Sequence, residues 1–227
     1  MTALYFTHIR SLTLVAAGAV ALFALLRLRQ GRTIEGTLTL AAGAALVVGA
    51  YLWALAVGGD AVSDRFSFAD QGVFRMFQEQ RGLVIRDTLS ELLYQFPFGA
   101  GLGRWGMMQI YFGDSTMWQA PAIHVEVQLT GWLLDGGIPL ILLYCGALFV
   151  ALRYSYVHAV APIARTWQDT AVIVLCMQLI LISLCMTGPV FNTQMGIMFW
   201  AVTGGLFGAT LRRDYDSSHE DPEAEHA

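Results

Sequence analysis

The fold is decided by residues 34–57, IEGTLTLAAGAALVVGAYLWALAV, a segment made mostly of leucine, alanine, valine and glycine. Its length exceeds the roughly 20 apolar residues that an α-helix needs to span the hydrocarbon core of a bilayer. A second segment of this kind, residues 11–28, precedes it, and the short connection RLRQGRT joins the two. Arg27, Arg29 and Arg32 crowd this connection, and the positive-inside rule therefore predicts that it lies in the cytoplasm.

The composition of the whole chain agrees with membrane spans. Of its 227 residues, 56% are apolar and 13% are charged, whereas soluble domains carry roughly 25% charged residues. The mean hydropathy is +0.56. We therefore expect an all-α polytopic integral membrane protein, and we exclude an ordinary soluble domain.

Three further spans are predicted, over residues 127–152, about 170–186 and 194–211. The first of them is interrupted at Asp135-Gly136-Gly137 and at Pro139. Such an interruption frees backbone groups that neighbouring chain or water must satisfy, and it is tolerated where the helix lines a cavity. The predicted total is about five transmembrane helices.

This pattern divides the chain into four parts. Residues 1–58 form two transmembrane helices, residues 59–122 a long extracytoplasmic loop, and residues 123–213 three transmembrane helices. Residues 214–227 form an acidic tail, which we expect to be disordered and cytoplasmic. Within the loop, the apolar periodicity of residues 73–96 predicts an amphipathic helix that lies at the membrane surface. The topology places the N-terminus outside, which suggests the C-terminal part of a longer protein.

Candidate phosphate-binding residues are arginines of this loop. A guanidinium grips phosphate through its planar fork, and Arg86 is the first candidate. The alternative is that Arg86 contacts lipid headgroups or pairs with Glu79 or Glu91. Arg75 lies about 16 Å from Arg86 along a continuous helix, and Arg81 is off its face, so any shared phosphate site must come from the tertiary fold.

Three glycines follow in the segment GAGLG: Gly99, Gly101 and Gly103. A dinucleotide-binding fingerprint needs a preceding strand and a following helix, and this segment is flanked by Phe-Pro-Phe and Arg-Trp-Gly instead. We predict that these glycines form positive-φ turns or let the backbone approach a ligand closely.

The acid and base candidates are His124, Glu126 and Asp135. His124 and Glu126 lie where the loop re-enters the membrane, and a histidine with neighbouring carboxylates has the properties of a general base. A structural hydrogen bond is the alternative for His124. Asp135 lies within a span, where acids are costly and often functional, although it can equally cap the helix break. The cysteines Cys145, Cys176 and Cys185 fall in apolar segments and predict neither a disulfide nor a metal site.

Taken together, these motifs resemble the C-terminal domain of the bacterial O-antigen ligase/polymerase family. The resemblance rests on Arg86, the segment Phe96–Gly103 (FPFGAGLG), His124 and the segment Leu133–Ile138 (LLDGGI). Members of that family have more spans than this chain, so a truncated member is one interpretation. In this chain His124 is followed by Val125, where the family often has asparagine.

The resemblance implies a membrane glycosyltransferase of the bacterial cytoplasmic (inner) membrane. It would move a glycan from a polyprenyl-diphosphate carrier to a hydroxyl of an acceptor glycan or glycolipid on the outer face, in cell-surface polysaccharide biosynthesis. Arg86 and His124 would be catalytic, and Arg75, Arg81, Gly101, Gly103, Glu126 and Asp135 would bind substrate. No cofactor, metal or nucleic acid is expected.

Two other functions remain open. A transporter or flippase subunit would place ionisable groups near the bilayer midplane, whereas here the polar groups gather in the loop. A non-catalytic, truncated membrane scaffold would tolerate loss of Arg86 or His124 with at most a change in stability.

Overall fold

The computed structural model describes residues 10–59, 86, 90, 93–102, 127–161, 163–186 and 188–219. All regular elements in these residues are helical. Four of the helices are long and apolar enough to cross a membrane: α3 (Thr33–Gly58), α9 (Gln128–Val160), α10 (Arg165–Leu184) and α11 (Gln194–His219). The expected all-α fold is confirmed for these residues, and the four apolar helices support the expected membrane protein.

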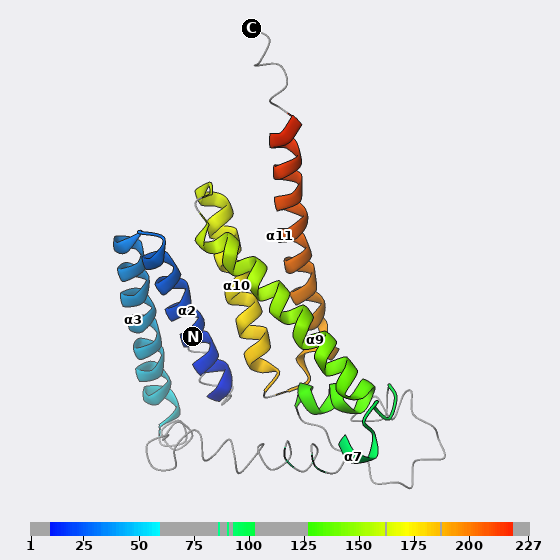
Figure 1. Cartoon of the computed structure of the whole chain (residues 1–227). Helices are drawn as coiled ribbons and strands as arrows, with labels where there is room; N and C mark the ends of the chain where they lie inside the picture. The colour runs from blue at the N-terminus through cyan, green and yellow to red at the C-terminus, as the bar shows by residue number, and fades with distance from the viewer. Residues whose placement is uncertain are drawn as a thin grey trace.

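The remaining described elements are α2 (Arg10–Arg29), the single turn α7 (Leu93–Gln95) and the 3₁₀ turn η4 (Val190–Asn192). α10 lies at the centre and packs against α2, α9 and α11, while α3 packs on α2 (Figure 1). A buried apolar cluster joins these helices through Leu26 of α2, Ala159 of α9, Leu175 of α10 and Leu206 of α11. The bundle therefore has its core around α10.

Glycine permits the close contact of α2 with α3. A Cβ atom added at Gly43 would lie 2.3 Å from a γ-carbon of Val20, and one at Gly36 would lie 2.7 Å from the side chain of Leu28. In lipid, where van der Waals packing contributes much of helix association, small residues let two helices approach closely. The two glycines are seven residues apart and so lie on one face of α3, the face that meets α2.

The bundle has two ends, which we name by their contents. The arginine end contains the turn between α2 and α3 and the turn between α9 and α10. The corner end contains α7, the start of α9, the end of α10 and η4. The turn at Ala161 has extended backbone, with φ −66° and ψ 149°, as expected for a residue that precedes proline.

Two boundaries differ from those predicted. α9 continues to Val160, eight residues past the predicted end of that span, because nothing before Pro162 breaks a helix. α11 continues to His219 and so includes residues 214–219 of the segment predicted to be disordered. Extending an existing helix fixes only one residue per added hydrogen bond and is much easier than nucleating a new one.

Candidate functional site

The most unusual feature of the corner end is a sharp corner inside α9 at Gly137. This residue has φ 63° and ψ −153°, far from helical values. The rings of Trp132 and Tyr144, on opposite sides of Gly137, stack with their centroids 4.4 Å apart, whereas twelve residues of straight helix would separate them by about 18 Å. α9 therefore consists of a short arm, residues 128–136, folded back on a long arm, residues 138–160.

The segment before the corner does not resemble a lipid-exposed span. Gln128 and Leu134 are fully buried, and Thr130 and Leu133 are at most 2% exposed. The interrupted third span was predicted as one helix with a break near its end; the break is where it was expected, but the short arm is enclosed by protein. Burial suits this part of the chain, because irregular backbone at membrane depth requires protein or water around it.

A segment distant in sequence fills the corner. The glycine loop, defined here as residues 96–102, places the Pro97 carbonyl 3.1 Å from the backbone nitrogen of Ile138, which donates to it. The backbone nitrogen of Ala100 in turn donates to the Leu134 carbonyl at 2.6 Å. In an uninterrupted helix the amide of Ile138 would donate to the carbonyl of Leu134. The loop has therefore replaced one helical hydrogen bond with two hydrogen bonds of its own.

Glycine is required on both sides of this junction. A Cβ atom at Gly137 would lie 2.2 Å from the Pro97 carbonyl oxygen and 2.6 Å from the nitrogen of Gly99. A Cβ atom at Gly99, whose φ is 88°, would lie 2.6 Å from the Cα of Gly136. Both clashes are with backbone atoms, which cannot rotate away. The two glycine motifs of the sequence are thus the two halves of one backbone contact.

Gly101 differs from Gly99 in what surrounds it. Its φ is 99°, and within the described part of the chain a Cβ atom built on it would meet nothing within 4 Å. Its glycine is therefore explained by backbone conformation, and it is exposed. There is space for a ligand to approach the backbone at Gly101, as predicted for these glycines, whereas the backbone of α9 already lies against Gly99.

Gln128 fixes the start of the short arm to the end of the bundle. Its backbone nitrogen donates to the Cys185 carbonyl at 3.1 Å, and its side-chain oxygen accepts from the backbone nitrogen of Phe191 at 2.9 Å. Its side-chain nitrogen lies 3.2 Å from the Asn192 side-chain oxygen. Gln128 was not among the site residues predicted from the sequence; a polar residue at the start of an apolar segment was the available signal.

An aromatic cluster supports the same region. Phe191 of η4 contacts Trp132 at 5.5 Å, Tyr144 at 6.0 Å and Phe199 at 5.2 Å between ring centroids. Trp200 joins through Phe199 at 4.9 Å. Offset and edge-to-face aromatic pairs add about 0.5–1.5 kcal/mol each beyond their burial. The cluster holds the two arms of α9 and the start of α11 together.

The predicted site residues fall into two groups. Among those described, Arg86 and Gly101 are exposed, and Asp135 is half-buried directly before the two glycines of the corner. Arg75, Arg81, Gly103, His124 and Glu126 lie outside the described residues, as do most of the predicted amphipathic helix and the end of the tail. The structure therefore joins Asp135 to the Gly99–Gly101 turn, and the other pairings stay predictions. In the described part of the chain no group of His, Cys, Asp and Glu side chains could hold a metal ion.

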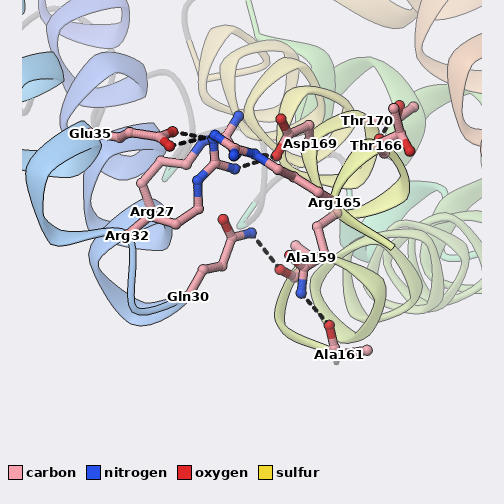
Figure 2. A network of polar contacts seen from close by, with 11 residues as sticks. Arg27, Gln30, Arg32, Glu35, Ala159, Ala161, Arg165, Thr166, Asp169 and Thr170 are labelled. Carbon is pink, nitrogen blue, oxygen red and sulfur yellow. Dashed lines mark hydrogen bonds and ion pairs between the residues drawn. The ribbon is translucent and has the colours of Figure 1, made fainter. Parts of the chain in front are cut away.

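The arginine end carries a second set of polar contacts (Figure 2). Arg27 of α2 pairs with Asp169 of α10, and the Nη1 of Arg32 lies 2.6 Å from Oδ1 of the same carboxylate. Arg32 also pairs with Glu35, which in turn pairs with Arg165. The five side chains form one chain of alternating charge that links α2, α3 and α10.

Burial differs along this chain of ion pairs. The Arg27 side chain is 7% exposed and that of Asp169 is 31% exposed, whereas Arg165 is 66% exposed. Exposed pairs contribute little to stability, but a buried charge that loses its partner is strongly destabilising. The contact of Arg27 with Asp169 is therefore the important one. The arginines were used in the sequence analysis to predict topology, and Asp169, four residues after Arg165, was overlooked.

These observations define a helical membrane protein with a cornered helix at one end and an ion-paired turn region at the other. No family model, no characterised protein and no solved structure matches the chain.

Proposed function

We propose that the chain is an O-antigen ligase/polymerase-like membrane glycosyltransferase that acts at the corner end of the bundle. The observation that carries this proposal is the junction between the glycine loop and the corner of α9. The segments 96–103 and 133–138 are two of the motifs on which, taken together, the resemblance to that family rests. The junction gives a physical reason for both to occur in one chain, since each supplies the backbone partners of the other.

The proposed topology has five spans, with α2 as the fifth beside the four apolar helices. The arginine end faces the cytoplasm, because Arg27, Arg29 and Arg32 lie there with Arg165. The corner end then lies at the outer face of the bacterial cytoplasmic membrane. A lipid-linked diphosphate presents its phosphates at this depth, and no nucleotide donor is needed.

In the proposed reaction, the bond between the anomeric carbon of the glycan and the carrier diphosphate breaks. A new bond forms from that carbon to an acceptor hydroxyl, whose proton passes to His124. Arg86 stabilises the negative charge that grows on the departing diphosphate, with Arg75 or Arg81 as a second phosphate ligand. Glu126 and Asp135 contact sugar hydroxyls. The substrate lies against the backbone of Gly101, which is exposed, and against Gly103.

Glycan transfer in membranes that contain the 227-residue chain tests this function. Membranes supplied with polyprenyl-diphosphate-linked glycan and an acceptor glycolipid are compared for wild type, His124→Ala and Arg86→Ala at matched abundance, with product length measured on a gel. Loss of a general base lowers rates by about 10²–10⁴-fold, and loss of one charge-stabilising donor lowers them by about 10²–10³-fold. We expect losses of these sizes.

Matched controls come from the arginine end of α9. The Nδ1 of His158 donates a local hydrogen bond to the Tyr154 carbonyl at 3.0 Å, and Arg153 is exposed. His158→Ala and Arg153→Ala should leave transfer unchanged. Absence of transfer by the wild type would contradict a complete enzyme, and equal transfer by wild type and His124→Ala would remove His124 from the mechanism.

A further inference from the structure

Three large apolar side chains project from the segment that docks on the corner. Tyr94 is 90% exposed, Phe98 79% and Leu102 82%. Pro97 and Ala100 make the backbone contacts with α9. Tyr94 precedes these contacts in the chain, Phe98 lies between them and Leu102 follows them. The segment is therefore held through its backbone, while the side chains of Tyr94, Phe98 and Leu102 are exposed.

The depth of this segment in the bilayer follows from the long arm of α9. From Ile138 to Val160 the arm rises about 33 Å at 1.5 Å per residue, and the hydrocarbon core is about 30 Å thick. The corner therefore lies at the boundary between hydrocarbon and headgroups. Because the Pro97 carbonyl is 3.1 Å from the Ile138 nitrogen, the backbone of the glycine loop lies at that boundary too.

The apolar surface continues from the long arm onto the loop. Ile138, directly after the corner, is 43% exposed, and Leu142 and Leu143 are 67% and 72% exposed on the next turn. These residues face lipid in a helix that crosses the membrane. Because the backbone nitrogen of Ile138 is hydrogen-bonded to the Pro97 carbonyl, the exposed Phe98, the next residue after Pro97, lies beside the end of the lipid-facing surface of α9.

We infer that residues 94–102 form a membrane-docking surface, in which Phe98 and Leu102 insert into the leaflet at the corner end and Tyr94 lies among the headgroups. The partner is the phospholipid bilayer itself. Tyrosine favours this interfacial depth because its ring is apolar and its hydroxyl polar, whereas the side chains of Phe98 and Leu102 are apolar throughout and favour the hydrocarbon. The inference holds whichever side of the membrane the corner end faces, and it does not depend on glycosyl transfer. Gly101, between the two inserted side chains, would lie at headgroup depth.

Spin-label accessibility tests the inference on the purified full chain in phospholipid vesicles. Cys145, the exposed native cysteine, is replaced by alanine while the buried Cys176 and Cys185 are kept. Single nitroxide labels are then placed at Phe98→Cys or Leu102→Cys. Collision with oxygen, which partitions into lipid, is compared with collision with a water-soluble nickel chelate. The labelled protein is diluted with unlabelled protein in the vesicles, which avoids spin–spin broadening of the spectra.

Two reference positions bracket the result. Leu142→Cys, on the lipid-facing long arm, gives the value for lipid. Ala164→Cys, an exposed position in the turn between α9 and α10 at the arginine end, gives the value for water. We expect the oxygen-to-nickel ratio at 98 and 102 to match that at 142 and to exceed that at 164 several-fold. A ratio equal to that at 164 would overturn the inference in favour of a water-exposed loop. Low collision with both reagents would overturn it in favour of protein, such as a second copy, covering the surface.

Discussion

Replacing Gly137 by alanine should detach the glycine loop from α9. The new Cβ atom would lie 2.2 Å from the Pro97 carbonyl oxygen, so either the loop or the corner must move. The conformation itself, with φ 63° and ψ −153°, belongs to a region used almost only by glycine. Holding alanine there costs about 1–3 kcal/mol.

The size of the effect is the sum of this strain and the hydrogen bonds at risk. The bonds of Ile138 to Pro97 and of Ala100 to Leu134 contribute about 0.5–1.5 kcal/mol each. The free energy that keeps the loop docked should therefore fall by about 2–6 kcal/mol. Since 1.4 kcal/mol is a factor of ten in an equilibrium constant, the docked loop should open at least about 30-fold more often.

Hydrogen–deuterium exchange of the peptides that contain Ala100 and Ile138 measures this opening directly. Gly146→Ala is the matched control, because Gly146 lies on the long arm of the same helix and a Cβ there meets nothing within 4 Å. In a helix interior alanine is favoured over glycine by about 0.8–1 kcal/mol, so the control should be unchanged or slightly more stable. Equal protection of both amides in Gly137→Ala and Gly146→Ala would refute the junction as described.

Two further pairs of substitutions, each a test with its control, probe the helix contacts away from the corner. Asp169→Asn leaves the guanidinium of Arg27 buried without its carboxylate and should lower the unfolding free energy by about 1–3 kcal/mol. This is less than for a fully buried pair, because the Asp169 side chain is 31% exposed. Arg165→Ala is the control: it removes an exposed ion pair and should change the unfolding free energy by at most about 1 kcal/mol. Gly43→Ala should lower the unfolding free energy by about 1–3 kcal/mol, because the new methyl group overpacks against the facing valine of α2. Gly49→Ala is the control, since a Cβ there meets nothing within 4 Å, and it should not lower the unfolding free energy. Unfolding in detergent micelles measures all four variants, and equal effects within a pair would contradict the helix contact that the pair tests.

The helices were predictable from sequence because their cause is local. An apolar segment in lipid must satisfy its own backbone hydrogen bonds, and only the helix does so within one segment. The predicted spans over 11–28, 34–57 and 194–211 therefore lie within the helices α2, α3 and α11. The position of the break was predictable for the same kind of reason, since Gly136-Gly137 and Pro139 disfavour helix wherever they occur.

The candidate site was predictable only in part. Gly99, Gly101 and Gly103 were predicted to form positive-φ turns or to let the backbone approach a ligand closely. Gly99 and Gly101 have positive φ, and Gly103 lies outside the described residues. The different surroundings of Gly99 and Gly101 were not predictable, because they arise from packing against residues 135–137, which contact Gly99 and not Gly101. Gln128 was missed for the same reason: its importance comes from the Phe191 amide and the Asn192 side chain, which lie more than sixty positions away.

By itself, then, the sequence determined that this is a helical membrane protein, where its long helices lie, and where one of them breaks. The tertiary structure alone decided that the short arm of α9 turns back into the protein, that the glycine loop accepts and donates the hydrogen bonds freed by the break, and that Asp169 pairs with Arg27. The physical reason is the range of the interactions. Helix formation and helix breaking depend on neighbouring residues, whereas the partners of a freed amide or a buried charge are supplied by whichever distant segment the packing of the bundle brings within hydrogen-bonding distance.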